Sequence, residues 1–422
     1  MTESIAPLHI LEYVLKNYGS PIYMYDEIGI RNRAKIFMDT FRKHIPNFKQ
    51  YFAVKATPNK HILEILKQEG MEFDCSSITE LELVHSLSTS SEVMYTSNYT
   101  SVEDFEKLLS SALQNTTINL DDTDGLENLV IASKNVNIAI PKLISFRLNP
   151  LIGSTNSETI SNVLGGPNTK FGIPSNKIIN AYKLAQQAGF TKFGIHVMTG
   201  SCVLDINYFK ELVDIVFENV NNIYQELGIT FEFVDLGGGI GINYRPEQQP
   251  INLEFLALTI SESVKLNIQK YNLPFDPVIA MENGRYITGP YGYLVSQCKS
   301  IKLGIDDKKF YGLDACMANL MRPGMYGAYH KITVPRLQMH LVELEEANVV
   351  GTLCENNDWF AKNRLLPKQI QKNDIFVIHD AGAHGFSMGF QYNGKLRSGE
   401  VLWNKDSGQI KVIRNKELKC FF

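Results

Sequence analysis

The sequence predicts an α/β chain in which a (β/α)8 barrel of the TIM type is joined to a C-terminal β-sandwich or β-barrel domain. Eight strand-like segments alternate with helical patterns over about 235 residues, which fits a closed barrel better than an open doubly wound sheet. After residue 284, strand-like segments continue without regular helices between them, which indicates a second, β-rich domain. The expected barrel strands are 50–54, 71–75, 93–95, 117–120, 143–148, 193–197, 231–236 and 278–281.

The helical patterns and the remaining strands give the domain limits. The segment 206–226 carries apolar residues at spacings of three and four, as in an amphipathic helix. A barrel is expected over 36–284, and residues 1–35 and 285–422 are expected to form the β-rich domain. The other expected elements are helices at 10–17, 61–69, 175–188 and 253–271, and strands at 21–25, 291–301, 309–312, 337–344, 347–350, 375–379 and 409–414.

Composition excludes several classes of protein. Of the 422 residues, 44% are hydrophobic and the net charge is −4, which favours a large folded core and argues against a nucleic-acid binder. No apolar run approaches the roughly 18 residues that cross a membrane, and the N-terminus lacks the features of a signal peptide. The six cysteines are scattered without Cys-x-x-Cys spacing, so we expect free thiols, no metal site and a cytoplasmic location.

Lys55 is the first candidate catalytic residue. It follows the apolar run Tyr51–Val54, and a lysine at the end of a buried strand points its amine into the mouth of the fold. Burial there is expected to lower the pKa of the amine, and a neutral amine can form a Schiff base. A strand-end lysine that simply reaches solvent is the alternative.

Two segments at later strand ends could bind a cofactor. The glycines 237–239 and 241 follow a strand and let backbone N–H groups approach a phosphate, to which Ser201 could add a hydroxyl. Glu282 ends the eighth strand, where a carboxylate can hold a protonated pyridine nitrogen, and Arg285 could bind a carboxylate. A tight turn and a structural Glu–Arg pair explain these residues equally well in isolation.

Three segments of the β-rich region also carry candidate residues. Residues 322–330 are too rich in glycine, proline and aromatics for an ordinary helix or strand, and they offer Arg322 and Tyr326 to an anion, or form a packed loop. Cys354 beside Glu355 could donate a proton, although a lone cysteine is more commonly a small buried hydrophobe. In residues 380–387, glycine and alanine permit close approach to the backbone.

Taken together, nine motifs in one order resemble diaminopimelate decarboxylase, a member of the fold-type III, alanine-racemase-like group of pyridoxal-phosphate enzymes. The resemblance covers roughly residues 20–403. The motifs are Phe-Ala-Val-Lys-Ala, Phe-Asp-Cys-Ser-Ser-x-x-Glu, Arg-x-Asn-Pro, Lys-Phe-Gly-Ile, Leu-Gly-Gly-Gly-Ile-Gly, Glu-x-Gly-Arg, Leu-Met-Arg-Pro-x-Met-Tyr-Gly-x-Tyr-His, Cys-Glu and Asp-Ala-Gly-Ala.

The resemblance implies pyridoxal 5′-phosphate as cofactor and a homodimer with shared active sites. It also implies decarboxylation of meso-2,6-diaminopimelate to L-lysine, the carboxy-lyase step of lysine biosynthesis. The implied roles are as follows: Schiff-base lysine, Lys55; proton donor contributed across the dimer interface, Cys354; cofactor contacts, Met198, Ser201, Gly238, Gly239, Glu282, Gly284, Arg285 and His384; substrate contacts, Arg285, Arg322, Tyr326 and Glu355.

Three positions depart from the family pattern. Met198 stands where the family has a histidine that stacks on the cofactor ring, and a thioether can still lie against an aromatic ring. Asn283 replaces the proline of the usual Glu-Pro-Gly-Arg. His384 replaces a tyrosine that reaches the phosphate, and an imidazole can still donate to phosphate.

The sequence leaves three alternatives to this function. One is a related decarboxylase that acts on ornithine, arginine or carboxynorspermidine, which Arg322 disfavours because a simple diamine precursor offers it no carboxylate. Another is a non-catalytic cofactor-binding protein, which Lys55, Cys354 and Glu282 disfavour because binding alone needs no proton donor. The third is a racemase of the same fold.

Overall fold

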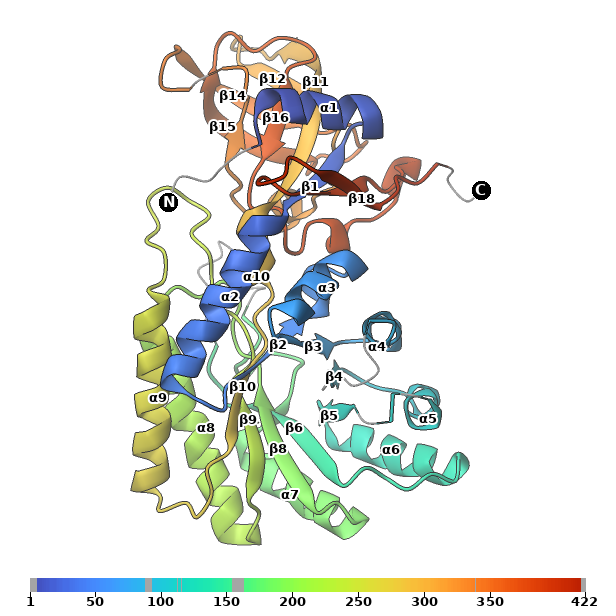
Figure 1. Ribbon diagram of the computed structural model, residues 1–422, viewed down its shortest axis with the longest axis vertical. Coiled ribbons are helices and arrows are strands. Elements are labelled where there is room, and N and C mark those ends of the chain that lie inside the picture. Colours follow the sequence, from blue (N-terminus) through green and yellow to red (C-terminus); the bar gives the residue numbers. More distant parts are fainter. Residues whose placement is uncertain are drawn as a thin grey trace. The chain divides into compact units, whose positions relative to one another are not determined.

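The computed structural model describes residues 6–87, 93–111, 113–114, 116–153, 163–337 and 339–418. The chain divides into two compact units (Figure 1). The barrel unit comprises 33–242 and 249–286. The β unit comprises the described residues of 1–32, 243–248 and 287–422.

The barrel unit contains a closed ring of eight parallel strands, which confirms the predicted (β/α)8 barrel. Neighbouring strands pair in the order β5-β4-β3-β2-β10-β9-β8-β6, and pairing of β5 with β6 closes the ring. A short ninth strand, β7 (Ile173–Pro174), pairs with β6. The ring strands are β2 (Lys49–Ala53), β3 (Glu72–Cys75), β4 (Val93–Ser97), β5 (Thr117–Leu120), β6 (Leu143–Asn149), β8 (Lys192–Val197), β9 (Phe231–Asp235) and β10 (Val278–Met281).

Helices surround these strands (Figure 1). Several begin at a side chain that accepts a hydrogen bond from the first turn, such as Asn59 before α3 and Asp122 before α6. None of the described helices is both long and apolar enough to cross a membrane. The helices are α2 (Glu27–His44), η1 (Val54–Ala56), α3 (Lys60–Gln68), α4 (Ile78–His85), α5 (Val102–Ser110), α6 (Thr123–Asn135), α7 (Ser175–Ala188), α8 (Ile206–Leu227), α9 (Leu253–Lys270) and α10 (Arg285–Thr288).

The interior of the barrel changes from apolar to polar along its strands. Tyr51, Met94, Phe233 and Ala280 form a buried apolar cluster. Alternate residues of a strand share a face, so the residues two positions further along point to the same interior nearer the carboxyl ends. Those residues are polar on three of the four strands and are buried: Thr96, Asp235 and Glu282. The fold therefore places buried polar groups beneath the end where barrel sites lie.

The β unit is built on a mixed sheet in which the N-terminal strand is central. Strand β1 pairs antiparallel with β11 and parallel with β17, in the order β15-β14-β12-β11-β1-β17-β18. Helix α1 buries Leu11 and Val14 in a cluster that includes Trp403. The elements are α1 (Leu8–Tyr18), β1 (Ile22–Asp26), η3 (Gly289–Tyr291), β11 (Gly292–Leu303), β12 (Lys309–Leu313), α11 (Arg322–Tyr326), β13 (Ile332–Thr333), β14 (Leu344–Val350), β15 (Trp359–Pro367), β16 (Ile375–Ile378), η4 (Phe386–Met388), η5 (Tyr392–Gly394), β17 (Gly399–Trp403) and β18 (Ile410–Arg414).

The predicted strand at 337–344 is wrong, because β14 begins only at Leu344. The chain turns just before this segment, where the N–H of Leu337 donates to the carbonyl of Val334 across Pro335, a residue suited to turns. Sequence analysis also missed β15 and β17. In β15 the register with β14 shifts twice, and these shifts break the apolar alternation that marks a strand.

A buried histidine of the β unit gives a pH prediction. Burial, followed by the charge of Lys331, lowers the pKa of His379 from 6.5 to about 3, so the folded protein holds this ring neutral. The unfolded chain takes up a proton below pH 6.5, which the folded chain does not. His379 therefore contributes stability that is fully present above pH 6.5 and is lost as the pH falls toward 3.

Between pH 7 and pH 5, we expect His379 to account for about 2 kcal/mol of lost stability, at 1.36 kcal/mol per pH unit below 6.5. His379→Gln, which cannot take up the proton, should show a correspondingly smaller loss when urea unfolding is followed at the two pH values. The exposed His9→Gln is the control and should behave as the wild type. Equal pH dependence of His379→Gln and wild type would contradict this account.

Candidate active site

Lys55 lies in the one-turn helix η1, directly after strand β2. Its Nζ is 3.3 Å from Oδ2 of Asp74 and 3.4 Å from Oγ of Ser76, at the end of the neighbouring strand β3. The Lys55 side chain is 44% exposed, whereas that of Asp74 is fully buried. The amine therefore stands at the carboxyl end of the barrel, between a buried carboxylate and open space.

The expected low pKa of Lys55 is wrong. Burial of the amine does lower its pKa, but the negative charges of Asp74, Glu282 and Glu80 together outweigh that effect and raise it. Without a bound ligand, the amine is held as an ammonium ion. Opposite charges within a few ångströms favour the charged form more strongly than partial burial disfavours it.

The pKa of Asp74 depends in part on the charge of this amine. Burial and the charge of Glu282 raise the pKa of Asp74 to about 6, while Lys55 acts in the opposite direction. Asp74 therefore loses its charge in mildly acidic solution. In the first turn of α4, Glu80 accepts a hydrogen bond of 2.7 Å from the backbone N–H of Ser76 and so fixes the turn between β3 and α4.

Glu282 follows β10 and is paired with His196 of β8. The two groups are buried, with 3.2 Å between His196 Nε2 and Glu282 Oε2. Burial raises the pKa of Glu282, but His196, Lys55 and Arg147 bring it below its usual value. The nearby Asp235 has its pKa raised well above normal by burial and by Glu282. Of these two acids, Glu282 is the one held ionised.

The second oxygen of Glu282 fits a ligand that carries a proton. Oε1 is buried and has no hydrogen-bond partner among the described residues. A buried carboxylate oxygen without a donor is costly, and a protonated pyridine nitrogen supplies the donor that it lacks. The site therefore fits the ring of pyridoxal phosphate.

A glycine loop beside Glu282 fits the phosphate. Gly237 has φ +66°, and a Cβ there would lie 2.1 Å from the carbonyl oxygen of Val197. At Gly238 a Cβ would lie 2.5 Å from the carbonyl oxygen of Glu282, and at Gly239 one would lie 2.6 Å from that of Gly200. Only glycine leaves the backbone room at these positions, which brings its N–H groups close to the strand ends.

The remaining residues predicted for the cofactor in the barrel unit gather around this loop. Met198 Sδ accepts a hydrogen bond of 3.2 Å from the N–H of Gly238. Arg285 donates to Oγ of Ser201 at 3.3 Å. A Cβ at Gly284 would lie 2.6 Å from that of Ala56, so the segment after β10 packs directly against the turn that carries Lys55.

Arg322 lies in the β unit and is buried. Residues 322–326 form the short helix α11, so the expectation that this segment is no helix is wrong for its first turn. His330 Nδ1 faces the carbonyl oxygen of His379 at 2.8 Å and must be the protonated nitrogen. Its Nε2 therefore accepts from Arg322 at 2.8 Å, while the ring of Tyr244 lies against the guanidinium.

Cys354 and Glu355 lie in an exposed turn between β14 and β15. The N–H of Cys354 donates to Asn393 at 2.7 Å. A Cβ at Gly324 would lie 2.3 Å from the carbonyl oxygen of Asn357, so α11, which carries Arg322 and Tyr326, packs on this turn. His384 lies apart on the segment after β16, half-buried with φ +55°.

The structure thus gathers the predicted residues of the barrel unit in one group, and Arg322, Tyr326, Cys354 and Glu355 of the β unit in another. It also adds residues that sequence analysis did not assign to the site. Asp74 is part of the Phe-Asp-Cys-Ser-Ser motif, and its place at a strand end was the available signal. Asp235 and His196 also sit at strand ends, but nothing in their sequence context distinguishes them from core polar residues.

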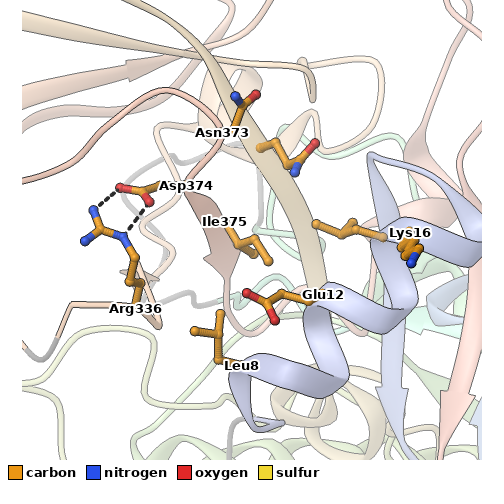
Figure 2. A pocket seen from close by; sticks show the side chains of 9 residues that line it. Leu8, Glu12, Lys16, Arg336, Asn373, Asp374 and Ile375 are labelled. Atoms are coloured by element: carbon orange, nitrogen blue, oxygen red, sulfur yellow. Dashed lines mark hydrogen bonds and ion pairs between the residues drawn. The ribbon is translucent and has the colours of Figure 1, made fainter.

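A separate cavity of about 360 Å³ lies in the β unit, beside α1 and β16 (Figure 2). Its lining includes Glu12, Lys16 and the ion pair of Arg336 with Asp374, whose two contacts are both 2.7 Å. The charged groups drawn there are paired or face solvent, and none is a predicted site residue. We assign this cavity no part in catalysis.

Comparison with known proteins places the barrel in a family. Residues 31–289 match the profile described as pyridoxal-dependent decarboxylase, pyridoxal binding domain. The chain is 36% identical over 413 residues to protein TabA of Pseudomonas amygdali pv. tabaci, covering 97% of this chain and 91% of that protein. It is 34% identical over 402 residues to diaminopimelate decarboxylase of Methanothermobacter thermautotrophicus, covering 95% and 90%.

Solved structures show the same likeness in three dimensions. Diaminopimelate decarboxylase from Helicobacter pylori complexed with L-lysine is similar, with a TM-score of 0.83 at 26% identity, covering 96% of each chain. The diaminopimelate decarboxylase from M. jannaschii in co-complex with L-lysine has a TM-score of 0.83 at 27% identity, covering 97% of this chain and 92% of that one.

The glycine loop offers a matched test. Gly237 and Gly228 have nearly the same positive φ, +66° and +67°, but a Cβ at Gly228 would meet nothing within 4 Å. Gly228→Ala should therefore cost only the left-handed strain, about 1 kcal/mol. Gly237→Ala should in addition displace the loop and weaken pyridoxal phosphate binding by roughly tenfold to a hundredfold. Titration of the two apoproteins with cofactor measures this, and equal affinities would contradict it.

Proposed function

The chain belongs to the family of pyridoxal-dependent decarboxylases, and from this premise we propose that it converts meso-2,6-diaminopimelate to L-lysine and CO2. The observation that carries the proposal is the similarity, over at least 95% of this chain, to several proteins named diaminopimelate decarboxylase. The geometry of both groups of site residues supports it.

The residues of the barrel unit would hold the cofactor at its two ends. The N–H groups of Gly238 and Gly239 and the hydroxyl of Ser201 would bind the phosphate, with His384 as a further donor. Glu282 Oε1 would accept the proton of the ring nitrogen. Met198 would lie against the ring, as its thioether permits. Lys55 would hold the cofactor through its Nζ.

When bound, pyridoxal phosphate supplies an electron-poor ring that accepts the electron pair left as CO2 departs. Glu282 favours this by remaining ionised and so keeping the ring nitrogen protonated. Asp74 holds the amine of Lys55 in its charged form until a ligand competes for it. Cys354 would then return a proton to Cα.

Arg322 is the residue that we assign to the distal carboxylate of the substrate. His330 and Tyr244 orient its guanidinium, so less conformational entropy is lost on binding than for a free side chain. A bidentate arginine–carboxylate contact is charge-assisted and stronger than a neutral hydrogen bond. Glu355, exposed on the neighbouring turn, would suit the distal ammonium, and Tyr326 and Arg285 would complete the substrate site.

Arg322→Ala should lower kcat/KM for meso-diaminopimelate by roughly thirtyfold to several thousandfold, because losing one partner of a desolvated charged pair costs about 2–5 kcal/mol. Turnover of lysine or ornithine should change much less, since neither has a distal carboxylate. Arg322→Lys should recover only part of the loss, because an ammonium lacks the planar fork.

Arg336→Ala is the control for this experiment, because it also removes a paired arginine of the β unit. It should leave substrate selectivity unchanged. An equal loss on all substrates in Arg322→Ala would remove the distal-carboxylate role and favour a decarboxylase of simple basic amino acids.

We further propose a homodimer in which Cys354 of one subunit serves the cofactor of the other. The exposure of Cys354 and Glu355 supports this, because a proton donor has to be shielded from water when it acts. The barrel over 36–284 would bind the cofactor, and the β-rich region, 1–35 and 285–422, would supply the shared residues. Free thiols at the described cysteines support a cytoplasmic location.

Mixing two inactive variants tests the shared site. Lys55→Ala and Cys354→Ala should each be nearly inactive. After unfolding and refolding together, they should recover about 25% of wild-type activity, because half of the dimers are mixed and each holds one intact site. Activity in Cys354→Ala alone, or no recovery on mixing, would contradict the shared site.

A further inference from the structure

Asn283 connects two parts of the cofactor site that come from distant stretches of the chain. It lies between Glu282 and Gly284 and is only 1% exposed. Its Oδ1 accepts from the backbone N–H of Ile240 at 3.2 Å, in the glycine loop. Its Nδ2 donates at 3.3 Å to Oε1 of Gln50, in the strand that leads to Lys55.

These hydrogen bonds form a bridge, Ile240–Asn283–Gln50, in which both side-chain amides have one allowed orientation. Nε2 of Gln50 donates at 3.0 Å to two carbonyl oxygens, those of Tyr51 and of Asn283 itself. An amide nitrogen donates and cannot accept, so Oε1 of Gln50 must face Asn283 Nδ2. The amide of Asn283 then has to turn its oxygen toward Ile240. The two buried side chains therefore satisfy one another, and neither can rotate without leaving a polar group unpaired.

Packing on both sides reinforces the bridge. The segment 282–284 leaves no room for a Cβ at Gly238 on the loop side. On the other side, a Cβ at Gly284 would clash with the side chain of Ala56, the residue next to Lys55. The distance between the glycine loop and Lys55 is therefore set through this segment, and Asn283 is the residue that hydrogen-bonds in both directions.

We propose that Asn283 is a positioning residue that fixes the spacing between the phosphate-binding loop and Lys55. This inference rests on the proposed cofactor site. A cofactor bound at its phosphate presents its reactive carbon to Lys55 only if that spacing is kept. Asn283 stands where the family pattern has proline, which has no side-chain amide, so the bridge belongs to this chain rather than to the general pattern.

The test compares Asn283→Ala, Gln50→Ala and the double variant. Each single variant should raise the dissociation constant of pyridoxal phosphate about tenfold to a hundredfold. In the apoprotein, hydrogen exchange at the amide of Ile240 should become faster in Asn283→Ala, because its acceptor is gone. The double variant should be little worse than the poorer single one, since both changes break the same bridge.

Asn267→Ala is the matched control. It removes a buried asparagine that bonds Asp214 and Ser263, away from the glycine loop. It should lower the melting temperature without changing cofactor affinity or the exchange of Ile240. Should Asn283→Ala fail to fold, Gln50→Ala alone decides the question by cofactor affinity and by exchange at Ile240, which should also become faster because the amide of Asn283 loses the partner that fixes its orientation.

Unchanged cofactor affinity in the folded variants, or additive effects in the double variant, would overturn the inference. Both readouts concern cofactor binding and the apoprotein. A wild-type protein that binds the cofactor but does not decarboxylate diaminopimelate would therefore refute the proposed function without deciding this point.

Discussion

One buried carboxylate, Glu282, has to remain ionised while two other acids share the same end of the barrel. Burial alone would neutralise it, as burial and Glu282 together do to Asp235. The difference is His196, whose ring faces Oε2 from strand β8, which is separated from β10 by β9. That contact leaves Oε1 buried and without a hydrogen-bond partner among the described residues, so the site favours a ligand that brings a proton to this point.

The close approach of the strand ends also determines the backbone conformation of the site. Parallel strands end at one rim, so side chains far apart in the sequence meet there, as Arg285 meets Ser201 across 84 residues. Glycines at 237–239 leave the backbone room at this rim, where its N–H groups would act as phosphate donors beside the hydroxyl of Ser201. The proposed site thus separates two tasks: carboxylates would tune charge at the ring end, and the glycine backbone would bind charge at the phosphate end.

Much of the fold was predictable from local sequence patterns, and each feature that the sequence analysis missed has a physical cause. The eight barrel strands show as short apolar runs because both of their faces are buried, and the strand end at Lys55 followed from one of them. The charge of Lys55 did not follow, because it depends on Asp74 and Glu282, which reach it only through the fold. Strand β15 was missed where its register slips, and the Asn283 bridge was invisible because its partner is remote in sequence. The roles of the predicted site residues remain proposals.

The central claim is that this site decarboxylates diaminopimelate in preference to simpler basic amino acids. The most direct measurement is CO2 release by the purified, cofactor-loaded protein from meso-diaminopimelate, lysine, ornithine and arginine in parallel, with identification of the product. The account predicts one CO2 and one L-lysine for each diaminopimelate consumed, with far lower kcat/KM on the other three. Preference for ornithine or arginine, or no CO2 from any of the four, would contradict it.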